Sequence, residues 1–312
     1  MRIKPKMKSY SIFLKLLLLF LPILSVAQSE KTDVDIFPHW EKDEIHKISL
    51  KSITTDIANK ITLQYSSTFS AHFKVLEKNE DEYLIEWTFT NAKLASTDKV
   101  VENILLANLI NKKIRIKFSS YGKFISLVNE DELRTAADKT IDKLMATTSN
   151  QSYKILLTSA KRIISTPQGI ESAILKPIKF YHYCFGHSFK LNEEVVNNVL
   201  VPNAIGGAPF NAIEKVKCRS IDQQKSTCTI ESSKIADGPA LTKAVKDFFI
   251  KNNKNQAQTI EKQFSNNNYE VSESTEHEIN FKTGTIIKAS FKRTVNLGVY
   301  NRTSLNEIQS AD

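Results

Sequence analysis

Long stretches of this chain alternate between apolar and polar residues, a pattern typical of β-strands with one buried face. The clearest stretch runs over Ile61–Val75, and a second follows over Tyr83–Phe89. Between them lies Asn79–Asp81, whose side chains favour a turn. The two stretches therefore predict a long antiparallel hairpin whose register is fixed by its buried face.

The same alternation predicts further strands elsewhere in the chain. It recurs around Ile48 and Leu50, over Ile114–Phe118, in a hairpin of Ile213–Ile221 with Ser226–Ser232, and over Tyr269–Phe281 and Thr285–Tyr300. Residues 178–185 are rich in aromatic and β-forming residues, so we expect another strand there.

Three other segments carry apolar residues at helical spacing: 130–145, 153–164 and 239–249. The first opens with three acidic residues, which suits a helix N-terminus, and Pro167 is expected to end the second. Only eight Gly and eight Pro residues are present, so the elements should be long. We predict an α+β fold, in which a long, curved, half-barrel-like antiparallel sheet packs its apolar face on amphipathic helices.

The composition is that of an ordinary globular protein. The 312 residues are 41% hydrophobic and 25% charged, which excludes wholesale disorder and a polytopic membrane protein. The formal net charge is +9, but residues 1–27 hold five of the 43 basic residues and no acidic residue. The other 38 basic residues stand against 34 acidic ones, a net charge of +4, which is too small to favour a nucleic-acid partner.

The N-terminus has the three parts of a secretory signal peptide. Four basic residues lie within the first eight positions, Leu16–Leu24 is apolar, and Ser25-Val26-Ala27 places small residues where cleavage requires them. We expect residues 1–27 to be removed after Ala27 and the protein to be exported to the periplasm or the extracellular space. An uncleaved anchor is the alternative, but the apolar stretch is shorter than the roughly 20 residues that span a bilayer.

The rest of the chain shows no boundary in composition. Residues 28–44 are mostly polar and predict a flexible lead-in, from which Ile36, Phe37 and Trp40 could dock. We expect a single α+β domain over residues 45–305 and a short tail over residues 306–312. No segment after the signal is apolar enough to span a membrane.

Several aromatic residues fall on the inward side of the predicted strands. Exposed together they would promote aggregation, so helices or a ligand must cover them. We expect Trp87 to be largely buried, and the stripe of Leu241, Ala244, Val245 and Phe248 is the best candidate cover. The candidate cavity residues are Phe69, Phe73, Trp87, Phe89, Phe291 and Phe248.

The three cysteines matter because export would place them in an oxidising compartment. Cys218 and Cys228 lie equally far from the expected turn of their hairpin and share one face, so they predict a disulfide; two buried thiols are the alternative. Cys184 lies among aromatic residues and is expected to be an inert core thiol.

No pattern in the sequence supports a catalytic or metal site. His182 and Cys184 are two residues apart, which is half of a site at most, because a metal needs three or four ligands. The chain contains no phosphate-binding loop, nucleophile elbow or zinc-protease motif. We therefore expect no catalytic residues, no metal and no cofactor, and we do not expect an enzyme.

A signal peptide followed by long alternating strands and covering helices resembles the lipoprotein-carrier class of periplasmic half-barrel proteins. The resemblance implies an apolar cavity between sheet and helices that accepts acyl chains. It is carried by Ile61–Val75, Tyr83–Phe89, Ile287–Val299 and Leu241–Phe249. The step from Tyr121 to Glu130 also resembles exported Bacteroidota proteins, which implies no function.

Two hypotheses follow for the role of the protein. One is a cell-envelope protein that binds an apolar or lipid-like ligand between its sheet and helices. The other is a structural or interaction module, with another envelope protein as its partner, whose helices fill the sheet face without leaving room for a ligand. A cavity of several hundred Å³ lined by the inward aromatic residues would favour the first hypothesis.

Overall fold

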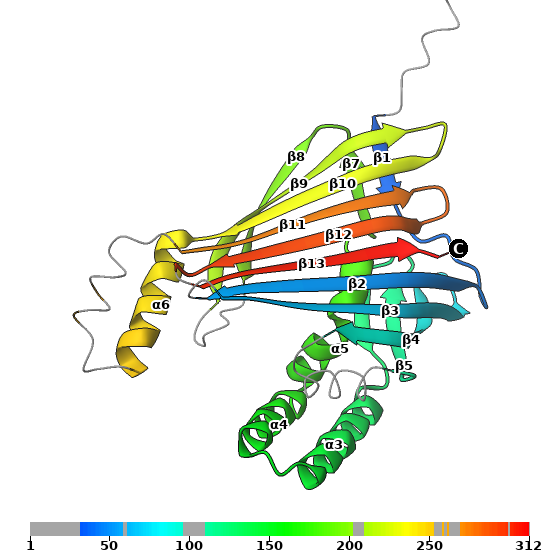
Figure 1. Cartoon of the computed structure of the whole chain (residues 1–312). Coiled ribbons are helices and arrows are strands. Elements are labelled where there is room, and N and C mark those ends of the chain that lie inside the picture. The colour runs from blue at the N-terminus through cyan, green and yellow to red at the C-terminus, as the bar shows by residue number, and fades with distance from the viewer. Residues whose placement is uncertain are drawn as a thin grey trace, which may run out of the picture. The chain divides into compact units, whose positions relative to one another are not determined.

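The chain folds around one open antiparallel sheet. The computed structural model describes residues 32–58, 61–95, 110–201, 209–252, 258, 261, 269–298 and 300–311. Within them, eleven strands pair in the order β6-β5-β4-β3-β2-β13-β12-β11-β10-β9-β8, each antiparallel to its neighbours (Figure 1). In this part of the chain β6 and β8 each have a single partner, so the sheet does not close into a barrel.

The strands of this sheet are β2 (Ile45–Ala58), β3 (Ile61–Lys78), β4 (Glu82–Ala95), β5 (Lys113–Ser119), β6 (Phe124–Leu127), β8 (Glu194–Val201), β9 (Phe210–Asp222), β10 (Thr227–Ala236), β11 (Glu270–Asn280), β12 (Thr285–Asn296) and β13 (Tyr300–Ser310). A separate two-stranded sheet joins β1 (Asp33–Ile36) to β7 (His187–Lys190). The long strands and the β3–β4 hairpin confirm what their alternation predicted.

Four helices are described: α3 (Glu130–Thr147), α4 (Gln151–Ile164), α5 (Pro167–Tyr181) and α6 (Gly238–Asn252). Helices α3, α4 and α5 pack against one another, and α5 also contacts β12. Helix α6 connects β10 to β11 and packs on β11, away from the other three helices (Figure 1). The α+β class predicted from the sequence is confirmed.

Helix α5 is the largest departure from the sequence prediction. The second predicted helix does end before Pro167, at Ile164. Pro167 also opens a helix that was not predicted, α5, whose first residue needs no N–H donor. The side chain of Thr166 caps this helix and accepts a hydrogen bond from Gly169 N at 3.0 Å. Residues 178–181 therefore belong to a helix and not to a strand, and residues 182–186 form a turn.

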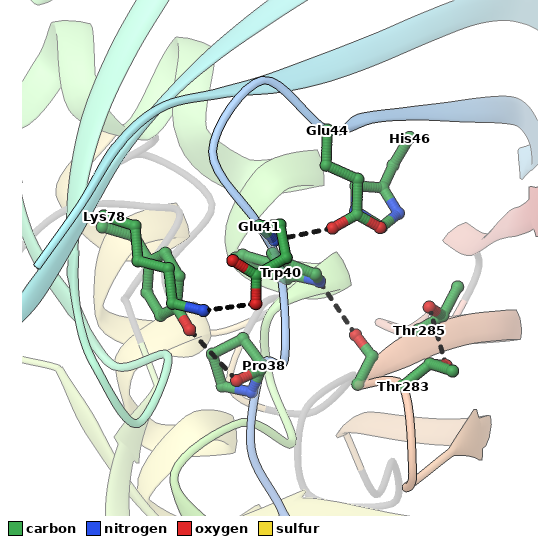
Figure 2. Close-up of polar contacts among 10 residues, drawn as sticks. Pro38, Trp40, Glu41, Glu44, His46, Lys78, Thr283 and Thr285 are labelled. Carbon is green, nitrogen blue, oxygen red and sulfur yellow. Dashed lines mark hydrogen bonds and ion pairs between the residues drawn. The ribbon is translucent and has the colours of Figure 1, made fainter.

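The described part of the predicted lead-in lies against the core. Trp40 is fully buried, and its Nε1 donates a hydrogen bond to the carbonyl of Gly284 at 3.1 Å, in the turn between β11 and β12 (Figure 2). Gly284 has a φ of +64°, and a Cβ there would lie 2.4 Å from the carbonyl oxygen of Phe37. Only glycine allows this approach of the two chain segments.

The boundaries at both ends differ from those expected. The segment from Asp33 to Glu44 contains β1 and Trp40, so it belongs to the folded unit Asp33–Asp312. Strand β13 continues to Ser310, past residue 305. The predicted signal peptide and residues 28–31 lie outside the described residues.

The buried side chains form two apolar clusters. The larger cluster joins the inner faces of β2–β5 and β9–β13 to α5. It also includes buried side chains of α3 and α4. The smaller cluster contains Leu241 and Val245 of α6 with Tyr269 and Val271 of the sheet. The helix that covers the inward aromatic residues is thus α5. The predicted stripe does meet the sheet through Leu241, Ala244 and Val245, but at other residues, so its expected role as the cover of those aromatics is wrong.

Candidate functional site

The inner face of the sheet changes from apolar to charged along the strands. Continuous register aligns its residues in rows that cross six strands or more, and neighbouring rows are two residues apart. One row is mainly apolar: Ile230, His277, Ala289, Ile308, Leu50 and Phe69. The next is mixed: Ser232, Thr275, Phe291, Asn306, Ser52 and Ser67. The third is polar and charged: Glu214, Lys234, Glu273, Arg293, Ser304, Thr54 and Tyr65.

A cavity of about 390 Å³ lies where these rows meet α5 and the turn that follows it. This volume is within the range of small-ligand pockets. Its apolar wall consists of Leu50, Phe69, Phe89, Phe180, Phe291 and Ile308. The lining also includes the polar residues Ser232, Thr275 and Asn306, which share the mixed row with Phe291, so polar groups border the apolar wall along the sheet.

The charged row is internally paired. Lys234 Nζ lies 3.4 Å from Glu214 Oε1 and 3.7 Å from Glu273 Oε2, and Arg293 Nη1 lies 3.5 Å from Glu273 Oε1. All four side chains are between 13% and 26% exposed, so each ion pair is partly withdrawn from water. Alternating signs across neighbouring strands make this arrangement favourable.

The end of α5 and the turn after it contact both the charged row and His277 of the apolar row. The hydroxyl of Tyr183 donates to Glu214 Oε1 at 3.1 Å, and its ring stacks on His277. Burial raises the pKa of Tyr183, so this phenol stays protonated. Phe180 packs edge-on against Phe291, and its carbonyl oxygen lies 3.0 Å from His277 Nε2.

The structure separates the candidate cavity residues into groups. Phe69, Phe89 and Phe291 line the cavity. Phe73 and Trp87 are fully buried in the adjoining core, as expected for Trp87. The side chain of Phe248 lies outside the described part of the structure.

The contribution of α5 to this site was not predicted from the sequence. Lys176, Phe180 and Tyr183 line the cavity, yet the last two lie in the segment predicted as a strand. The buried residues Ile174, Leu175, Ile178 and Tyr181 follow helical spacing, and that spacing was the available signal.

Two histidines are buried as neutral groups. His182 is surrounded by aromatic rings, among them Trp40 and Phe118, and within the described residues neither ring nitrogen has a hydrogen-bond partner. Burial, with a smaller contribution from the charge of His46, lowers the pKa of His182 to about 3. Burial also lowers the pKa of His277 to about 4, against the opposing effect of its bond to the Phe180 carbonyl.

The predicted disulfide between Cys218 and Cys228 is absent, and all three cysteines are free. The turn between β9 and β10 is centred later than expected, so Cys228 lies opposite Ile221 and Cys218 opposite Ile230. A β-bulge at Thr229–Ile230 accompanies this offset. Burial raises the pKa of each thiol, that of Cys228 to about 12, which leaves protonated and unreactive groups.

The described ranges can be compared with the requirements of a metal site and of a membrane-spanning helix. Among these residues, no three or more His, Cys, Asp or Glu side chains are grouped so that they could hold a metal ion. None of the described helices has both the length and the apolar character needed to cross a bilayer.

Comparisons with known proteins give only distant likenesses. No protein-family model and no curated protein sequence matches the chain. A lipovitellin structure described by its lipid–protein interactions is similar over 88% of this chain with 7% identity and a TM-score of 0.43, and the chain spans 26% of its length. DynF, from the dynemicin biosynthesis pathway of Micromonospora chersina, is similar over 90% of this chain and 86% of its own, with 6% identity and a TM-score of 0.20. At such scores these likenesses indicate nothing about a ligand.

Proposed function

We propose that this protein binds an apolar, lipid-like ligand in the cavity between α5 and the sheet. The observation that carries the proposal is the cavity of about 390 Å³ with aromatic rings along one wall. Beside the cavity, the rings of Phe73 and Trp87 are fully buried and stack on each other. The neighbouring core is therefore filled by side chains, whereas the cavity is not. A module with a completely self-filled core would not retain this space.

The apolar wall determines what the ligand must offer. Burying apolar surface stabilises a complex by about 25 cal/mol per Å² before the costs of association are subtracted. The rings of Phe69 and Phe291 and the side chains of Leu50 and Ile308 are available for contact with an alkyl chain or a flat apolar group. A strongly polar solute would find no hydrogen-bond partner on this wall.

A pair of variants on β3 tests whether binding occurs in the cavity. Ser67 lines it, and Ser67→Phe should place a ring in the space and weaken binding of the neutral apolar fluorophore N-phenylnaphthylamine about tenfold. Ser66→Phe puts the same side chain on the other face of the same strand and should leave the affinity within about twofold. Fluorescence titration of the full chain measures both. Equal affinities for the two variants would contradict the proposed site.

We also propose that the protein is exported and acts in the cell envelope. The proposal is supported by the order of basic, apolar and small residues in residues 1–27. Mass analysis of protein isolated from its native host should give a chain that begins at Gln28. A mature chain that still begins at Met1 would show that the segment is an anchor or remains inside the cell.

A further inference from the structure

Lys176 places a positive charge at the cavity that no carboxylate balances. It lies on α5, lines the cavity, and its Nζ is 5.8 Å from the centroid of the Phe291 ring. None of the carboxylates in the described part of the chain lies within ion-pair distance of this ammonium. The neighbour of this ammonium is thus the face of an aromatic ring on the apolar wall.

The other charged groups around the cavity already have partners. Glu214, Lys234, Glu273 and Arg293 pair along their row, which leaves that row without net charge. Two further charged residues of the lining also form an ion pair: Lys51 Nζ and Glu307 Oε2 lie 3.3 Å apart. The ammonium of Lys179 lies 4.4 Å from the centroid of the Phe124 ring, and Lys179 has a further interaction besides this ring contact. The uncompensated charge is therefore that of Lys176.

The surroundings of Lys176 are unfavourable to its charged form. Desolvation by the protein lowers the pKa of its ammonium, the charge of Arg293 lowers it further, and Glu273 opposes the effect only in part. The side chain is nevertheless reachable from solvent, so an incoming group can approach it. An anion beside the ammonium would relieve both the desolvation and the repulsion, and such charge-assisted hydrogen bonds are the stronger ones in proteins.

We infer that the ligand is a single-chain amphiphile with an anionic headgroup, whose chain lies along the aromatic wall while its headgroup pairs with Lys176. The inference rests on the proposed function and specifies its ligand. Lys176 and Phe291 lie together at the cavity, so one molecule can contact both through its head and the start of its chain. A carboxylate and a phosphate would serve equally well, because both present anionic oxygens to an ammonium.

Calorimetric titration of the full chain with matched amphiphiles tests this assignment. The probes share one chain and differ in headgroup: dodecanoate and dodecyl phosphate are anionic, dodecanol is neutral and dodecyltrimethylammonium is cationic. At pH 8 and below micelle formation, both anions should bind about tenfold or more tightly than the alcohol. Preference for only one of the anions would identify carboxylate or phosphate as the source of the headgroup.

Variants of α5 assign the preference to one side chain. Lys176→Met should bind the anions and the alcohol with similar affinity, and Lys176→Arg should keep most of the preference. Lys179→Met removes a neighbouring ammonium that also lines the cavity and should retain the wild-type order. Lys176→Glu should favour the cationic probe, a gain that loss of folding cannot produce.

The outcomes separate this inference from the proposal on which it rests. Equal affinity of the wild type for dodecanoate, dodecyl phosphate and dodecanol would overturn the headgroup assignment while leaving an apolar site. Preference for anions that survives Lys176→Met would overturn it as well. Failure of all four probes to bind the wild type would overturn both the assignment and the proposed function.

Discussion

Replacing Trp40 by alanine should lower the free energy of unfolding by about 3–5 kcal/mol. The indole is fully buried and packs against the rings of Phe73, Tyr83 and Phe185. Its Nε1 also donates to the Gly284 carbonyl, so truncation removes both apolar burial and a hydrogen bond to the β11–β12 turn. Urea unfolding followed by circular dichroism measures the change.

The control for this experiment lies in the same segment. Phe37 is only partly buried and meets Tyr121 edge-on, so Phe37→Ala should cost roughly 1 kcal/mol. If Trp40→Ala cost no more than Phe37→Ala, residues 37–44 would be a loosely held lead-in, as the sequence suggested, and not part of the core.

Acidification should destabilise the protein well before its carboxylates titrate. His182 and His277 remain neutral in the folded chain, with pKa values of about 3 and about 4, whereas their value in an unfolded chain is near 6.5. The unfolded state therefore binds more protons as the pH falls below 6.5. Stability should decrease by roughly 1.4 kcal/mol per pH unit for each of the two histidines.

A variant distinguishes His182 from other titrating groups. Between pH 6.5 and pH 5, His182→Phe should remove at most about half of the decrease in unfolding free energy, since His277 and His187, whose pKa values burial also lowers, still take up protons on unfolding. Urea unfolding over this pH range tests the expectation. A wild-type stability that does not change with pH would mean that the buried rings are already protonated or are solvated.

The strands could be predicted from the sequence because, in a half-buried sheet, apolar and polar residues alternate along each strand. The residues of Ile61–Val75 needed no knowledge of their neighbours to be assigned. Pairing was a different matter: β13 lies between β2 and β12, although β2 and β13 are about as far apart in the chain as two strands can be. Nothing local encodes such a partner.

The candidate site was predicted only in part, for two physical reasons. Aromatic residues from 178 to 185 have high strand propensity, but packing on the sheet favoured a helix followed by a turn, and propensity is the weaker influence. In the Cys218–Cys228 hairpin, a shift of the turn by a residue or two was enough to separate the cysteines. The alternation along each strand, in contrast, placed Phe69, Phe89 and Phe291 correctly at one face of the sheet. Which face a residue occupies depends only on its own strand, so it was unaffected by the misassigned helix and the shifted turn.

Locating a bound alkyl chain in a crystal shows directly whether the cavity is the binding site. A crystal of the protein grown with dodecanoic acid that carries bromine at its methyl end would reveal the bromine by anomalous scattering. We expect a bromine peak inside the cavity, within about 4 Å of the side chains of Phe69, Phe89 or Leu50. Bromine found only on the outer surface of the sheet, or an empty cavity at saturating ligand, would contradict it.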